Sequence, residues 1–133
     1  HLNRLEQVLL RRELAQHAVA REAVVCDIDG HVVEGVASNL FFVRDGVLHT
    51  PALQRAGVAG VMRAEVLAEA ACAGIALQQG DYLPAALQAA DELFFCNSVC
   101  GIWPVRELDG KACRIGPLTR QLQRHWQSVR EGA

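Results

Sequence analysis

The chain has 133 residues, of which 51% are hydrophobic and 21% charged, and its formal net charge is −2. This length and composition predict one globular domain with a buried core and exclude a disordered chain. The nearly balanced charge argues against nucleic acid as a partner, and no apolar run approaches the roughly 18 residues that cross a membrane.

The cysteines and the first residues indicate the cell compartment. Five cysteines are present, an odd number with no metal-ligand spacing, and they predict free thiols in a reducing cytoplasm and no metal site. The first six residues include the charged Arg4 and Glu6 and do not resemble a secretory signal. We therefore expect a cytoplasmic protein with no membrane partner.

The first half of the chain is predicted to form one helix followed by four strands. Leu2, Leu5 and Leu9 recur at helical spacing, which predicts a helix from Leu2 to Ala20. Asp-Gly pairs at positions 29–30 and 45–46 are typical of hairpin turns and separate apolar runs, which we expect to form an antiparallel meander. The strands expected from these runs are Ala23 to Ile28, His31 to Gly35, Asn39 to Val43 and Val47 to Thr50.

The second half is predicted to alternate helices and strands. A loop over residues 51–60 precedes a helix from Val61 to about Ala73, which Gly74 would end in the left-handed conformation. The run Glu92 to Asn97 is almost wholly apolar, so we expect a central strand there. The other expected elements are a strand over Ile75 to Gln79, a short helix over Pro84 to Ala90, a strand over Ile102 to Glu107 and a last helix from Gly116-Pro117 to about Arg130.

Glu34 is the most informative residue in the chain. It lies in a run of apolar and small residues between Gly30 and Phe42, where an ionised carboxylate is costly to bury unless a partner neutralises it. A nearby arginine would satisfy it, and so would the protonated ring nitrogen of a bound cofactor. The residues alone leave both interpretations open.

The stretch Gly57 to Arg63 leads from a loop into a predicted helix. Glycines let the backbone approach a ligand closely, and the first N–H groups of a helix lack internal partners and carry the positive end of its dipole. These features suit a phosphate group. An ordinary strand-to-helix turn remains the alternative, because the stretch matches neither a Walker loop nor a dinucleotide-binding fingerprint.

Other candidate residues follow the apolar strand. Asn97 and Ser98 come at its end, where ligand contacts are common, although a capped strand end would look the same.

The one lysine, Lys111, lies in a Leu-Asp-Gly-Lys turn, so we expect it to be solvated rather than catalytic. The histidines form no metal pattern, and no nucleophile signature is present.

Four motifs, in order along nearly the whole chain, resemble one family. Residues 1–8 resemble the segment that follows the cofactor-binding lysine of 4-amino-4-deoxychorismate lyases. The Glu-Gly-x-x-Ser-Asn-Leu-Phe run from Glu34 to Phe41 is similar to the signature of the pyridoxal-phosphate-dependent fold type IV group, which includes D-amino-acid and branched-chain aminotransferases. Gly57 to Arg63 resembles its phosphate-binding turn, and Asn97-Ser98, ahead of Pro104-Val105, resembles its second phosphate contact.

The resemblance implies a fold and a set of cofactor contacts. The fold is a mixed α/β domain whose largely antiparallel sheet is partly closed into a barrel with packed helices, and the cofactor is pyridoxal 5'-phosphate. Glu34 would pair with the protonated pyridine nitrogen, and Asn39 would brace the loop beside it. The backbone N–H groups of Val61 and Met62 would hold the phosphate, and the Asn97-Ser98 pair would add donors to it.

The resemblance also implies an activity and an assembly. The lyases of this family convert 4-amino-4-deoxychorismate to 4-aminobenzoate and pyruvate, a step of folate biosynthesis, and the family forms homodimers. In the family the cofactor-binding lysine stands just before the position of His1, so we expect the lysine and an N-terminal domain to lie outside this chain. Residues 1–133 are then expected to be a single C-terminal cofactor domain, inactive by itself.

Two other functions remain open. Branched-chain aminotransferases share the signature, but they carry Tyr where this chain has Leu5 and tend to carry Thr where Met62 and Trp103 stand. These departures favour the lyase, whereas Asn3 keeps a resemblance to the D-amino-acid aminotransferases. The remaining alternative is a non-catalytic half that serves folding or dimerisation.

Overall fold

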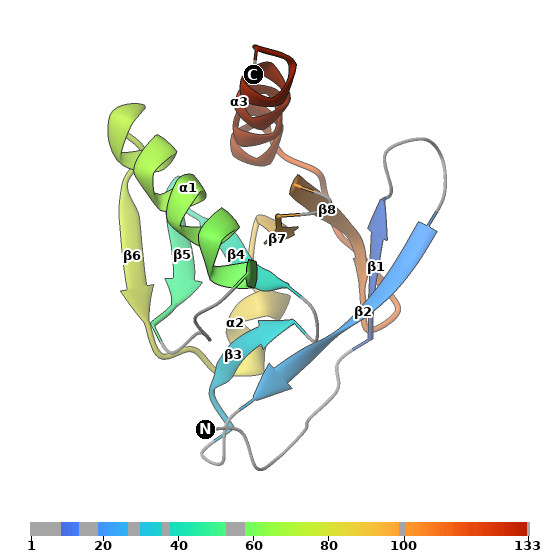
Figure 1. Cartoon of the computed structure of the whole chain (residues 1–133). Helices are drawn as coiled ribbons and strands as arrows, with labels where there is room; N and C mark the ends of the chain where they lie inside the picture. The colour runs from blue at the N-terminus through green and yellow to red at the C-terminus, as the bar shows by residue number, and fades with distance from the viewer. Residues whose placement is uncertain are drawn as a thin grey trace.

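The computed structural model describes residues 9–13, 19–26, 30–35, 38–52, 58–98 and 101–132. Within these ranges the chain forms nine strands and three helices (Figure 1). The strands are β1 (Leu9–Glu13), β2 (Val19–Cys26), β3 (Val32–Gly35), β4 (Asn39–Arg44), β5 (Val47–Pro51), β6 (Leu77–Gly80), β7 (Glu92–Asn97), β8 (Gly101–Leu108) and β9 (Lys111–Ala112). The helices are α1 (Val58–Cys72), α2 (Pro84–Gln88) and α3 (Pro117–Gly132).

The described strands form one sheet in the order β3-β2-β1-β8-β7-β4-β5-β6, with β9 beside β8. Every pairing is antiparallel except that of β5 with β6. The two ends of the sheet meet where the N–H of Val32 on β3 donates to the carbonyl oxygen of Tyr82, just after β6, over 2.6 Å. The mixed, largely antiparallel α/β fold is confirmed, while closure into a barrel stays a prediction.

The helix predicted from Leu2 to Ala20 is wrong wherever the structure describes it. Residues 9–13 form β1 and Val19 begins β2, and the rest of the predicted helix lies outside the described ranges. β1 pairs with β2 on one side and with β8 on the other, so two neighbouring strands satisfy its backbone groups. This tertiary pairing overrides a local apolar spacing that also suits a helix.

The strands predicted in the first half are present, but they do not form a continuous meander. The strand predicted from Ala23 to Ile28 begins earlier, at Val19, and its last two residues lie outside the described ranges. β3 pairs with β2 and β4 with β5, as the two predicted hairpins require. On its other side β4 pairs with β7 rather than β3, in a register that sets Asn39 beside Cys96 and Phe41 beside Phe94. The rings of Phe41 and Phe94 stack 5.2 Å apart, so the apolar strand β7 takes the position expected for β3.

Two apolar clusters lie on opposite faces of the sheet, because alternate residues of a strand point to opposite sides. Phe41 and Phe94 belong to the cluster that packs beneath α1 and α3, the two helices that lie close together in Figure 1. Phe42 and Phe95 belong to the other cluster, against which Leu87 of α2 packs. The predicted central position of β7 is confirmed, since this strand lies between β8 and β4 and is buried from its first residue to Cys96.

The helix predicted from Val61 begins three residues earlier, at Val58, and ends at Cys72. Its end follows the prediction, because Gly74 adopts a φ of 72°. The N–H of Ile75 then donates to the carbonyl oxygen of Ala70 over 2.9 Å, which satisfies a carbonyl group that the helix leaves open. α1 therefore starts closer to β5 than the glycine pattern indicated.

Two glycines with similar backbone angles allow the destabilisation caused by backbone strain to be distinguished from that caused by steric contact. Gly101 has a φ of 73°, and a Cβ there would lie 2.1 Å from Nε1 of Trp126, whereas Gly110 has a φ of 83° and open space around it. We expect Gly110→Ala to lower the free energy of unfolding by about 1–2 kcal/mol through strain alone. Gly101→Ala should cost roughly 1–3 kcal/mol more, because the indole of α3 must move. Urea unfolding of both variants measures the difference, and equal losses would contradict this packing.

Candidate active site

The predicted site residues gather at one edge of the sheet. β4 runs antiparallel to both β5 and β7, and β6 runs parallel to β5, so β5, β6 and β7 end at the edge where β4 begins. In the sequence, only residues 36–38 separate the end of β3 from the start of β4. Figure 1 shows the first turn of α1 on the same side as the arrowheads of β5 and β6. Glu34, Asn39, Asn97 and the start of α1 therefore lie toward one edge.

Glu34 is buried on β3, with 6% of its surface exposed. Its backbone pairs with Val25 of β2, and the preceding Val32 and Val33 are buried as well. The bridge from Val32 to Tyr82 holds the start of this short strand against the opposite end of the sheet. Because the low-dielectric interior strengthens electrostatic interactions, a carboxylate fixed in this position strongly favours a cationic partner.

The residues around the start of β4 are polar and buried. Ser38 has 3% of its surface exposed and Asn39 none. Thr50 on β5 is also fully buried, and its hydroxyl donates to the carbonyl oxygen of Leu40 over 2.8 Å, which ties β5 to β4 beside Asn39. The amide of Asn39 thus lies in a rigid part of the sheet, directly along the chain from the segment that carries Glu34.

The other predicted contacts lie at the end of β7 and the start of α1. Asn97, the last residue of β7, is half-buried and pairs with Gly101, and Ser98 is exposed in the turn that follows. The side chain of Val61 is 56% exposed, whereas that of Met62 is 2% exposed and belongs to the core. Since α1 begins at Val58, the N–H of Met62 is directed at the carbonyl of Val58, as in any regular helix.

Arg63 is a site residue to which the sequence assigned no role. Its Nη2 donates to the carbonyl oxygen of Pro51 over 3.2 Å and to Oε1 of Gln79 over 2.8 Å, while its buried Nε has no hydrogen-bond partner in the described part of the chain. Burial lowers the pKa of this guanidinium, and nearby Cys96 acts in the opposite direction. The sequence contained an indication of a role for Arg63, because a cation close to the positive end of a helix dipole is unfavourable unless another interaction compensates for it.

A second feature missing from the sequence prediction is an aromatic cluster at the β5–β6 end of the sheet. Nδ1 of His49 lies 2.9 Å from the hydroxyl oxygen of Tyr82, and the His49 ring stacks on Phe42 at 4.8 Å. The edge of the Tyr82 ring meets Phe42 at 4.9 Å. Tyr82 also provides the carbonyl that binds Val32, so this cluster supports the strand of Glu34. The contact joins residues 33 positions apart, which no local pattern reveals.

The His49 environment predicts a dependence of stability on pH. Burial, and then the positive charge of Arg44, lower the pKa of His49 below its usual 6.5. The unfolded chain therefore binds a proton at His49 more readily than the folded chain, and stability should fall as the pH drops below 6.5 toward the lowered pKa. Urea midpoints measured across this range test the prediction. His49→Asn should flatten the slope, and an unchanged slope would exclude His49 as its source.

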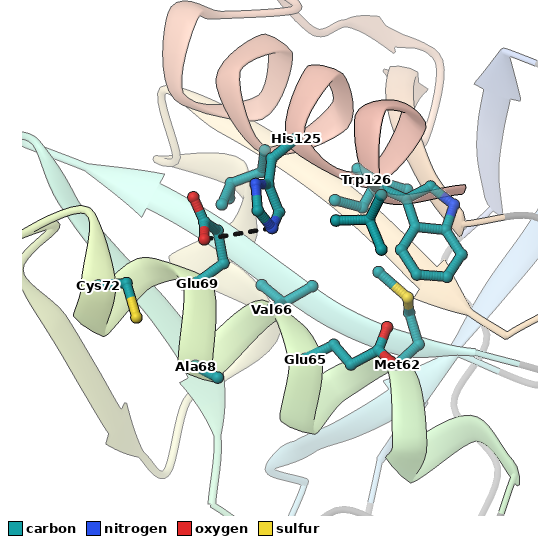
Figure 2. A pocket seen from close by; sticks show the side chains of 11 residues that line it. Met62, Glu65, Val66, Ala68, Glu69, Cys72, His125 and Trp126 are labelled. Atoms are coloured by element: carbon teal, nitrogen blue, oxygen red, sulfur yellow. Dashed lines mark ion pairs between the residues drawn. The ribbon is translucent and has the colours of Figure 1, made fainter. Parts of the chain in front are cut away.

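A separate cavity of about 270 Å³ lies between α1 and α3. Figure 2 shows Glu69 of α1 and His125 of α3 facing each other there, with 3.2 Å between Oε1 and Nε2, and Met62 and Trp126 farther along the cavity. None of the predicted contacts except Met62 lines it. The cavity is mainly apolar and belongs to the helix-covered face, so it is distinct from the polar edge that carries Glu34.

Two properties of the described residues bear on other classes of function. No group of three or more histidine, cysteine, aspartate or glutamate side chains in these ranges could hold a metal ion. Among the described helices, none combines the length and the apolar character needed to cross a membrane. Of the five cysteines, Cys26, Cys72, Cys96 and Cys113 are free thiols, and Cys100 lies outside the described ranges.

Comparison with known proteins identifies relatives of two activities. The chain is 40% identical over 127 residues to an aminodeoxychorismate lyase of Vibrio harveyi, covering 92% of the chain and 46% of the relative. It is 33% identical over 124 residues to a branched-chain-amino-acid aminotransferase of Escherichia coli, covering 91% of the chain and 40% of the relative. The chain therefore spans less than half the length of these relatives.

Solved structures of a lyase and of an aminotransferase also match the chain. A 4-amino-4-deoxychorismate lyase from Pseudomonas aeruginosa matches with a TM-score of 0.75 and 49% identity, over 87% of this chain and 42% of that protein. An aminotransferase from Brucella abortus bound to the cofactor PLP matches with a TM-score of 0.74 and 26% identity, over 80% of this chain and 38% of that protein. The amino-transferase class IV family model matches residues 1–108, and the chain belongs to this family.

Proposed function

We propose that the edge formed by β3, β4, β7 and the start of α1 binds pyridoxal 5'-phosphate. The observation that carries this proposal is the burial of Glu34, 6% exposed on a strand at that edge, in a family with a PLP-bound relative. A fixed carboxylate next to the pyridine nitrogen keeps that nitrogen protonated. With its nitrogen protonated, the bound cofactor withdraws electrons from the carbon next to the substrate nitrogen. The role of Glu34 is thus to hold one proton at one atom.

The remaining contacts in the proposal hold the phosphate and brace the site. Asn97 and Ser98 donate hydrogen bonds to the phosphate from the end of β7, and Asn39 supports the segment between β3 and β4. The N–H groups of Val61 and Met62 bind the phosphate at the start of α1. Because the helix begins at Val58, the use of the Met62 N–H requires the first turn to open. Arg63 leaves an orphaned buried donor nearby, which fits an anion in this region.

The proposed reaction is conversion of 4-amino-4-deoxychorismate to 4-aminobenzoate and pyruvate, within folate biosynthesis. The support for this reaction is similarity to lyases. The chain is 40% identical to the Vibrio harveyi lyase and 49% identical to the solved lyase from Pseudomonas aeruginosa. The corresponding identities to branched-chain aminotransferases of Escherichia coli are 33% and 30%. Loss of a ring proton and departure of the enolpyruvyl ether leave an aromatic product, which makes the elimination favourable. We further propose that the cofactor-binding lysine and a smaller domain correspond to the part of the relatives that this chain does not span. The complete protein is proposed to be a cytoplasmic homodimer.

A substrate comparison tests the proposed reaction. The complete protein, supplied with pyridoxal 5'-phosphate, is incubated with 4-amino-4-deoxychorismate, and 4-aminobenzoate is quantified by its fluorescence after separation. Parallel reactions contain D-alanine or leucine with 2-oxoglutarate. We expect product in the first reaction and little amino transfer in the others. Amino transfer without 4-aminobenzoate would replace the lyase with an aminotransferase, and no turnover of any substrate would favour a non-catalytic role.

A further inference from the structure

Arg63 connects the helix that carries the proposed phosphate turn to the ends of two strands. It is the sixth residue of α1, and its Nη2 bonds both Pro51, the last residue of β5, and Gln79 of β6. Thr50 and Gln79 are direct neighbours in the parallel pairing of these strands. A single guanidinium therefore fixes the distance between the start of α1 and the edge where β5 and β6 end.

The charge of Arg63 is poorly neutralised by this arrangement. Both acceptors are neutral oxygens, and no carboxylate of the described ranges forms an ion pair with Arg63. The ionisable group on the sheet that interacts electrostatically with Arg63 is Cys96, a buried thiol whose pKa is raised by burial, so it carries no negative charge at neutral pH. A partly buried cation with neutral partners stabilises an anion that enters its surroundings.

The helix itself adds to this positive potential. The first turn of α1 contains no acidic residue, so the positive end of the dipole is not compensated by the chain. Arg63 belongs to the second turn of the same helix, and its guanidinium, with a buried Nε, reaches the ends of β5 and β6. The helix terminus and the Arg63 guanidinium therefore both add positive potential to the side of the sheet on which we place the doubly charged phosphate.

We infer that Arg63 is a positioning residue that makes this edge selective for phosphorylated over unphosphorylated pyridine ligands. This inference rests on the proposed binding of pyridoxal 5'-phosphate. Arg63 acts by holding the start of α1 against β5 and β6 and by adding a positive charge to the surroundings of the phosphate. Its effect should therefore be large for a ligand with a phosphate and small for the same ring without one.

The test compares two ligands that bind without a lysine. Dissociation constants of pyridoxine 5'-phosphate and of pyridoxine are measured by calorimetry on the complete protein. The variants are Arg63→Met, which keeps the apolar stem but removes the charge, and Arg63→Lys, which keeps the charge but cannot reach two acceptors in the same way. Arg124→Met is the matched control, because Arg124 is an exposed arginine on α3.

We expect Arg63→Met to weaken binding of pyridoxine 5'-phosphate by about tenfold or more, with pyridoxine changed by less than about twofold. Arg63→Lys should retain part of the preference, and Arg124→Met all of it. Equal weakening of both ligands in Arg63→Met and Arg63→Lys would overturn the inference and leave the cofactor site standing. Failure of the unmodified protein to bind pyridoxine 5'-phosphate would overturn the cofactor proposal, and the inference with it.

Discussion

Replacement of Glu34 by glutamine in the complete enzyme should lower turnover by about a hundredfold or more while the fold is kept. Glutamine has the shape of glutamate, and the side chain is 6% exposed on β3, so the packing around it changes little. The amide carries no negative charge, however, and cannot keep a pyridine nitrogen protonated. The loss therefore falls on the chemistry rather than on stability. Turnover of 4-amino-4-deoxychorismate at saturating cofactor measures it.

Glu65→Gln is the matched control for this experiment, because Glu65 is an exposed glutamate on α1. It should leave both turnover and the unfolding midpoint unchanged. The nitrogen-15 NMR spectrum of the bound cofactor gives a second measurement, since the chemical shift of the pyridine nitrogen reports whether that nitrogen is protonated. Near-normal turnover of Glu34→Gln, with an unchanged spectrum, would show that Glu34 has another role.

One strand that was predicted correctly, β7, and one that was predicted wrongly, β1, show which parts of this fold the sequence specifies. β7 forms over Glu92–Asn97 as predicted, because a continuous apolar run bounded by polar residues suits a strand buried on both faces. β1 was predicted as helix, because Leu5 and Leu9 share a helical spacing that also fits other structures. The conformation of these residues is decided by pairing with β2 and β8, and the partner residues on β8 lie 93 to 98 positions further along the chain.

The same distinction applies to the candidate site. Glu34 and Asn97 stand out in the sequence as polar residues next to apolar strands, whereas Asn39 is indicated only by the family resemblance, and the roles of all three stay predictions. The position of Arg63 within a recognisable turn was also visible, but its bonds to Pro51 and Gln79 depend on the parallel pairing of β5 with β6. Such contacts are set by the fold and not by neighbours in the sequence, so only the structure reveals them.

Glu92 anchors α3 to the centre of the sheet. It is 6% exposed at the start of β7, and its Oε1 accepts hydrogen bonds of 2.8 Å from both the N–H and the hydroxyl of Thr119. Its Oε2 accepts a longer bond of 3.4 Å from the N–H of Leu118. These donors belong to the first turn of α3, so a carboxylate from a distant strand caps the helix and complements its dipole. A Cβ at Gly116 would lie 2.2 Å from the carboxyl carbon of Glu92, so this close packing of the carboxyl group requires glycine at that position.

Glu92→Ala should lower the free energy of unfolding by about 3 kcal/mol, because it leaves the buried Thr119 hydroxyl and two helix N–H groups without their charged acceptor. Glu92→Gln should lose less, since its amide oxygen can still accept one bond. Thr119→Val removes only the hydroxyl, and in combination with Glu92→Ala its effect should be strongly non-additive. Urea unfolding of the single and double variants measures this coupling. Additive losses would mean that Glu92 stabilises the protein through packing alone, and that α3 holds its position without the cap.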